Sequence, residues 1–230
     1  RVLAIRAKVL GPDHADTAAS LSALAGLYFK GGDYEKAAPL IERSLQIYEK
    51  ASGPSHPHTL TVIRNLIELY QSAGQYAKAM PHAERSLKLC EQKFGVEDAE
   101  TAAALMTLAL VHVGLGEHSQ AEVLYLRSLE ICEKTFGLAH TNTATLLNHL
   151  ALNYQSMTFY EQAEPLFQRS LEIREKALGP DAPDTAMSLN NLAGNYLKSG
   201  DFAKAHPLFQ QSLRIREKVL GPDDPDTATS

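Results

Sequence analysis

A repeat of 42 residues runs through this chain of 230 residues without an insertion. Glycine recurs at this step, and a threonine stands six residues after each of these glycines. The glycines are Gly11, Gly53, Gly95, Gly137, Gly179 and Gly221, and the threonines are Thr17, Thr59, Thr101, Thr143, Thr185 and Thr227. A short repeat cannot bury its apolar side alone, so each copy must pack on the next one. The period therefore argues against an ordinary globular domain and predicts a stack of similar units.

Each copy has the pattern of two helices joined by a short turn. In the fifth copy, Gly179 ends the preceding helix, and Asp184 or Thr185 is expected to cap the next one. The turn falls at Gly200, and Asp201 is the candidate cap of the second helix. The first helix carries one apolar stripe at three- and four-residue steps, which consists of Leu189, Leu192, Ala193 and Tyr196. No segment alternates with a period of two, so we expect no strands.

The predicted fold is all-α, a right-handed α-solenoid (superhelix) of five helix-turn-helix units with partial repeats at both ends. The units are expected at residues 11–52, 53–94, 95–136, 137–178 and 179–220. Residues 1–10 match the tail of a second helix, and residues 221–230 match the start of a further repeat. Solenoid ends normally carry polar capping elements, and none is visible in the sequence. We therefore expect one continuous solenoid domain that is a fragment of a longer protein.

The columns of the repeat resemble the tetratricopeptide repeat (TPR). A Leu-Ala-x-x-Tyr pattern recurs in the first helix, for example at Leu150, Ala151 and Tyr154, and an alanine recurs near the start of the second. The longer 42-residue unit, with an extended second helix and a Gly-Pro-Asp type of loop, is similar to the repeats of the kinesin light chain. One turn departs from the pattern, because Thr158 stands in place of glycine. The resemblance covers essentially the whole chain and implies five TPR units.

Composition and charge narrow the classes of partner. The net charge of −5 and the isoelectric point near 6.0 argue against nucleic acid, because phosphate binding needs a clustered basic surface. No apolar run approaches the length of a membrane span, and the first residues lack the layout of a signal peptide. Two cysteines do not make a disulfide framework, so we expect free thiols at Cys90 and Cys132 and a cytoplasmic location.

The resemblance implies a concave groove lined by the first helices, where TPR proteins usually bind peptides. The first helices are expected to carry only four charged residues, Lys30, Arg64, Glu68 and Lys198. A helical wheel finds the positions opposite the buried stripe, and these give the candidate peptide-binding residues. They are Asn148, Asn190, Asn191, Asn65, Arg64, Met106, Leu110, His149, Leu152 and Gln155. In kinesin-light-chain-type arrays, asparagines at such positions hold a peptide backbone, since an amide both donates and accepts hydrogen bonds.

Several of these positions also have a structural explanation. Asn65 and Asn191 could bond to the neighbouring repeat instead of to a ligand. Arg64 and Glu68 stand four residues apart and are expected to pair with each other on the helix surface. The apolar patch around Met106 could be packing between helices. The Lys-and-Asn arrangement with which some TPR proteins clamp a C-terminal carboxylate is not reproduced, and acidic peptides would find few basic partners.

The sequence carries no motif for catalysis, for a metal or for a cofactor, so we do not expect an enzyme. His14, His56 and His140 share one loop column, which indicates a role in loop structure. The leading hypothesis is a scaffold that binds a peptide segment of a partner protein in the concave groove. The alternative is a structural spacer, or an array that associates end to end, which regulates an effector domain outside this chain.

Overall fold

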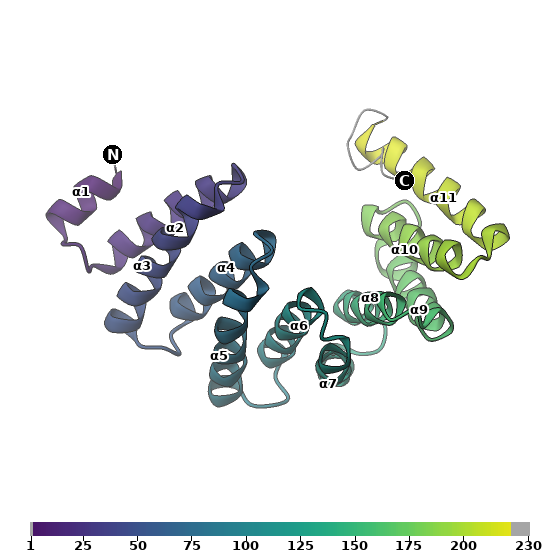
Figure 1. Ribbon diagram of the computed structural model, residues 1–230, viewed down its shortest axis with the longest axis horizontal. Helices are drawn as coiled ribbons and strands as arrows, with labels where there is room; N and C mark the ends of the chain where they lie inside the picture. The colour runs from purple at the N-terminus through teal and green to yellow at the C-terminus, as the bar shows by residue number, and fades with distance from the viewer. Residues whose placement is uncertain (1, 222–230) are drawn as a thin grey trace. The chain divides into compact units, whose positions relative to one another are not determined.

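The computed structural model describes residues 2–221, and every regular element in that range is an α-helix, as predicted (Figure 1). The helices are α1 (Val2–Val9), α2 (Ala15–Lys30), α3 (Tyr34–Ser52), α4 (Pro57–Ser72), α5 (Tyr76–Phe94), α6 (Ala99–Gly114), α7 (His118–Phe136), α8 (Thr141–Ser156), α9 (Tyr160–Leu178), α10 (Pro183–Ser199) and α11 (Phe202–Leu220). They form two compact units, Arg1–Glu117 with α1 to α6 and His118–Ser230 with α7 to α11. None of the helices in the described range is long and apolar enough to cross a membrane.

First and second helices alternate along the chain as the repeat requires. The even-numbered helices α2 to α10 are the first helices of their pairs, and the odd-numbered helices α3 to α11 are the second helices. The expected start of a further repeat lies almost wholly at residues 222–230, outside the described residues.

The glycine and threonine columns meet in the loop between successive helix pairs. Each glycine of the 42-residue step has a φ angle between 89° and 98°, a conformation that disfavours any residue with a side chain. In each described loop, the threonine Oγ1 donates to the carbonyl oxygen of the glycine at 2.7–3.0 Å. The donors are Thr17, Thr59, Thr101, Thr143 and Thr185. This bond closes the loop and sets where the next helix begins. It explains why the glycine and the threonine both recur every 42 residues.

Histidines at the ends of these loops cap three of the first helices. The Nδ1 of His14 accepts a hydrogen bond from the backbone N–H of Asp16 at 3.1 Å. The side chains of His56 and His140 likewise accept from the backbone N–H two residues later. Before α6, the carboxylate of Asp98 makes this contact instead. The predicted structural role of the histidine column is therefore confirmed.

Of the caps predicted for the last helix pair, one is wrong and one is confirmed. α10 begins at Pro183, so Asp184 and Thr185 lie inside the helix, and the residue before Pro183 makes no side-chain cap. Proline favours the first helical position because its fixed φ suits the helix and its missing N–H needs no partner there. Asp201 does cap α11, where its carboxylate accepts from the backbone N–H of Lys204 at 3.2 Å.

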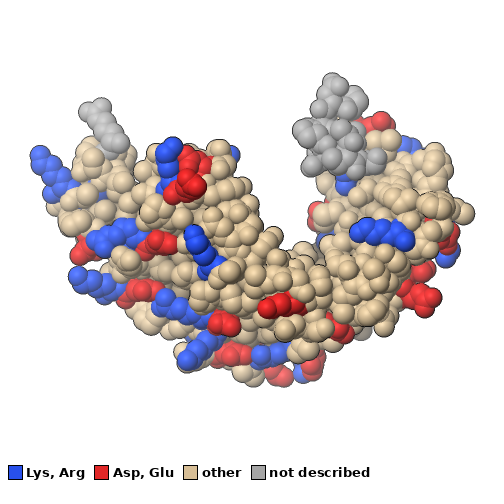
Figure 2. Space-filling model, in the orientation of Figure 1, with Lys and Arg blue, Asp and Glu red and all other residues tan. Residues whose placement is uncertain are grey.

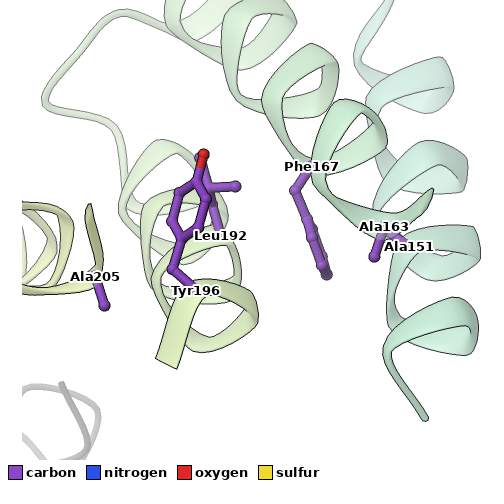
Figure 3. Packing of buried hydrophobic residues seen from close by; sticks show 6 residues of the cluster. All are labelled: Ala151, Ala163, Phe167, Leu192, Tyr196 and Ala205. Atoms are coloured by element: carbon purple, nitrogen blue, oxygen red, sulfur yellow. The ribbon is translucent and has the colours of Figure 1, made fainter. Parts of the chain in front are cut away.

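The core is built where first and second helices of successive pairs meet. In the unit His118–Ser230, Phe167 of α9 is fully buried among residues of α8, α9 and α10, including Ala151 and Tyr196 (Figure 3). Burial of a side chain of this kind stabilises a fold by roughly 1.5–3 kcal/mol. All four residues of the predicted stripe are buried, which confirms the helix phase: Leu189, Leu192, Ala193 and Tyr196.

Buried serines of the second helices tie the two helices of a pair together. The hydroxyl of Ser44 donates to the carbonyl oxygen of Ala18 at 2.9 Å. Ser170 and Ser212 repeat this contact at 2.8 Å, each to the alanine 26 residues earlier. The bond satisfies a hydroxyl that would be costly to bury without a partner.

The turn between α8 and α9 holds the one described non-glycine residue with a left-handed backbone, Thr158, at a φ of 65°. The equivalent positions of the other turns are glycines with φ between 68° and 87°, namely Gly32, Gly74, Gly116 and Gly200. A residue with a Cβ pays roughly 1–2 kcal/mol to adopt this conformation, and β-branching adds crowding.

Replacing Thr158 with glycine should therefore raise the free energy of unfolding by about 1 kcal/mol, because the turn is kept and its steric conflict is removed. Urea unfolding measures the change. The reverse substitution in the next turn, Gly200→Thr, is the matched control and should destabilise the chain by a similar amount. A less stable Thr158→Gly variant would show that the threonine side chain makes a compensating contact.

Candidate functional site

The first helices carry few charges, and α8 has no Asp, Glu, Lys or Arg among its 16 residues. The charged residues of the other first helices are Asp16, Lys30, Arg64, Glu68, Glu100, Asp184 and Lys198. Figure 2 shows charges of both signs interspersed on the visible face of each unit, with broad uncharged areas between them. Contacts with a ligand on these helices would therefore depend mainly on hydrogen bonds and apolar packing.

In the unit Arg1–Glu117, the arginine of α4 is engaged by the next first helix. Arg64 forms an ion pair with Glu100 of α6, so the expected pairing with Glu68 within α4 is wrong. The carboxylate of Glu100 reaches the guanidinium of Arg64 from the neighbouring repeat, and the spacing of residues within α4 alone does not predict such a contact. Asn65, the next residue of α4, is exposed.

An open hollow of about 360 Å³ lies at the ends of α4 and α6 in the same unit. Its lining is mainly apolar with a polar rim, and consists of Gln71, Ser72, Tyr76, Leu110, Val113 and Gly114. A Cβ atom at Gly114 would lie 2.2 Å from the ring of Tyr76, so the position accepts only glycine unless the ring moves. Of the predicted apolar candidates in this unit, Leu110 lines the hollow, and Met106 is half-buried outside its lining.

In the unit His118–Ser230, two polar bonds join the neighbouring first helices α8 and α10. The Nδ2 of Asn191 donates to the Oδ1 of Asn148 at 2.8 Å, and the Nζ of Lys198 donates to the Oε1 of Gln155 at 2.8 Å. Both bonds span 43 residues, so they are equivalent steps between adjacent repeats. The structural explanation for Asn191, a bond to the neighbouring repeat, is thus present in the structure.

The two predicted residues that accept these bonds, Asn148 and Gln155, are themselves buried, and the other candidates of this unit make separate contacts. His149 stacks on the ring of Tyr125, with centroids 6.1 Å apart and an interplanar angle of 4°. Burial lowers the pKa of His149 below its usual value, and the positive charge of Arg174 lowers it further. Asn190 is half-buried, and its Oδ1 is buried without a donor among the described residues. Leu152 packs against the cluster around Phe167.

Three polar residues of this unit that are absent from the predicted set are buried in or next to the first helices. Arg174 is only 3% exposed. It belongs to a second helix, α9, but its side chain reaches the first helices α8 and α10. Asn153 donates to the carbonyl oxygen of His118 at 2.9 Å, and Asn195 donates to that of Tyr160 at 3.0 Å. The two asparagines stand one repeat apart, and that shared column was the signal that could have revealed them.

The predicted free thiols are confirmed, since Cys90 and Cys132 are both buried and unpaired. Burial raises the pKa of each thiol above its usual value. Raised pKa values keep a cysteine in its unreactive thiol form. Cys132 packs as a small apolar side chain, whereas Cys90 also makes side-chain hydrogen bonds with Arg64 and Ser86.

A family model named tetratricopeptide repeat matches residues 1–50, 21–92, 58–134, 100–158 and 142–218. The chain belongs to the tetratricopeptide repeat family. TPR arrays are general scaffolds for protein–protein interaction, and the TPR fold is typically non-enzymatic. No curated protein sequence matches the chain.

Solved structures resemble this TPR chain over most of its length. BtubC (BKLC) from P. vanneervenii is 26% identical with a TM-score of 0.75, over 90% of this chain and 82% of that one. A kinesin-light-chain-like protein from Podosopora anserina, with nearly identical TPR-like repeats, is 25% identical with a TM-score of 0.74, over 89% and 97%. A Rap protein complexed with competence and sporulation factor has a TM-score of 0.69 at 16% identity, over 91% and 61%, a likeness of fold alone.

Because the pKa of His149 is lower in the folded TPR chain, the unfolded chain binds more protons as the pH falls. The contribution of His149 to the free energy of unfolding is therefore complete above a pH of about 6.5. It is lost as the pH falls towards the pKa of His149 in the folded chain. His149→Phe should reduce the loss of stability between about pH 7.5 and 5. His206→Phe, at an exposed position of α11, is the control. Urea unfolding at several pH values tests this, and equal slopes for wild type and His149→Phe would contradict it.

Proposed function

We propose that the chain binds a peptide segment of a partner protein along the exposed sides of its first helices, in a concave groove of the TPR type. The observation that carries this proposal is the pair of bonds from α10 to α8, Asn191 to Asn148 and Lys198 to Gln155. Asn148 and Gln155 are buried, whereas Asn191 is half-buried and has a second amide N–H and its oxygen beyond the bond to Asn148. A peptide unit offers the matching N–H and C=O groups, so it can pair with this amide without its side chains being read.

The hollow of the unit Arg1–Glu117 is a separate candidate site, which would hold an apolar side chain of a peptide. Leu110, Val113 and the ring of Tyr76 supply apolar walls, and the hollow opens to solvent. Ligand sites commonly combine such an apolar lining with a few polar groups. With few charges on the first helices, we expect the affinity to depend only weakly on salt concentration.

The two buried cysteines support a reducing compartment, and we propose a cytoplasmic location on that ground. The protein would then serve as a scaffold that holds a partner by an exposed segment. Selection of a random-peptide phage library on the purified chain tests the binding directly, with fluorescence anisotropy of a selected peptide as the measurement. A selection that enriches no peptide would overturn the proposal and favour a structural spacer.

Asn191→Ala should lower the affinity for the selected peptide about tenfold, because it removes an amide from the proposed contact with the peptide backbone. Asn142→Ala, at an exposed position in the first turn of α8, is the matched control and should leave the affinity unchanged. Since Asn191 also bonds to Asn148, the free energy of unfolding is measured in the same buffer. A variant that folds as stably as wild type and binds with the same affinity would remove Asn191 from the site.

Gly114→Ala should also weaken the peptide, by roughly 1–3 kcal/mol if an apolar side chain occupies the hollow, because the new Cβ displaces the ring of Tyr76. Gly26→Ala is the matched control, since a Cβ there meets no atom within 4 Å. That control should leave the affinity unchanged and stabilise α2 by up to about 1 kcal/mol. Equal affinities for the two variants would exclude the hollow as an anchor without excluding the contacts on α8 and α10.

A further inference from the structure

One column of residues stands four positions before the end of most second helices, and its arginines reach the following first helix. The column consists of Arg6, Tyr48, Cys90, Cys132, Arg174 and Arg216. Arg6 of α1 donates from one guanidinium nitrogen to the carbonyl oxygen of Asp16 at 3.1 Å and to the Oγ of Ser20 at 2.9 Å. Both acceptors belong to the start of α2, so Arg6 links one helix pair to the next.

Arg174 of α9 repeats these contacts in the other unit. It donates to the carbonyl oxygen of Asp184 at 3.3 Å and to the Oγ of Ser188 at 2.8 Å, both in α10. The acceptors stand 10 and 14 residues ahead, as they do for Arg6. The agreement of two junctions in different units shows a recurring contact rather than a chance one.

The residue 14 positions ahead changes together with the column. It is serine after both described arginines, Ser20 and Ser188, and it is apolar after the other members. The apolar pairs are Tyr48 with Val62, Cys90 with Ala104, and Cys132 with Leu146. In all five described junctions this residue is the sixth of its first helix and is buried.

Burial explains why the two positions must agree. The guanidinium of Arg174 is almost wholly buried, and burial lowers its pKa, which reflects the cost of holding a charge away from water. The serine hydroxyl accepts one of its N–H groups, so leucine at this position would leave that donor unsatisfied. After Tyr48, Cys90 and Cys132, the buried residue at this position is apolar, so its side chain has no polar atom to satisfy.

We propose that these two positions form a recognition surface by which one helix pair selects the next. A second helix with arginine in this column fits a first helix with a buried serine at its sixth residue. A second helix with cysteine or tyrosine in this column fits a first helix with an apolar residue there. The partner of the Arg174 surface is thus a repeat of the serine kind.

A double-mutant cycle in the full chain tests this selection, with Arg174→Cys, Ser188→Leu and the two combined, which copies the pair found at Cys132 and Leu146. Hydrogen exchange of the α10 amides measures local opening at the junction. In the wild-type background, Ser188→Leu should speed exchange at least about tenfold. In the Arg174→Cys background, the same substitution should speed exchange by about threefold or less. The same factor in both backgrounds would overturn the proposal.

A second arm keeps the test informative if Ser188→Leu does not fold. Ser188→Ala removes the acceptor without adding bulk, and its effect should also shrink in the Arg174→Cys background. Arg169→Cys is the control, because Arg169 pairs with Glu133 of α7, on the other side of α9 in the sequence from α10. The effect of Ser188→Leu or Ser188→Ala should stay undiminished there, and an equal reduction would show that the loss of any α9 arginine suffices.

Discussion

In the unit His118–Ser230, the helix pair α8–α9 completes its apolar core with residues of the next pair. Phe167 belongs to α9, but it is enclosed by α8 on one side and by Leu192 and Tyr196 of α10 on the other. A core shared in this way works only if successive pairs present their apolar residues at the same spacing. The loop that ends at Thr185 must therefore have a fixed length, and its bond to the carbonyl of Gly179 holds it at that length. The constancy of the 42-residue step follows from this shared burial.

The sequence predicts what depends on a periodic pattern and misses what depends on the neighbouring repeat. The stripe that ends in Tyr196 follows from helical spacing alone, and it is buried as expected. The pairing of Arg64 with Glu68 is wrong because the stronger competitor, Glu100, belongs to another helix. Arg174 escapes notice because it reaches the first helices from a second helix.

Local chemistry explains the remaining difference between expectation and structure. Asp184 is of a residue type that often caps helices. However, α10 begins at Pro183, so Asp184 lies inside the helix. Asn191 shows a different limit, because its position was predicted while its bond to Asn148 was only one of two alternatives. Asn191 is half-buried, so the amide that joins α8 and α10 stays partly exposed to solvent.

The arginine of each polar junction belongs to one helix pair and the serine to the following pair. A pair can therefore stack on a copy of itself only when its own two ends agree. The pair α10–α11 carries Ser188 at its start and Arg216 at its end, so tandem duplication of its gene segment would create a matched junction. The pair α2–α3 carries Ser20 and Tyr48, and its duplication would set a tyrosine against a serine. Growth of such an array by recombination is thus limited by which segments are copied.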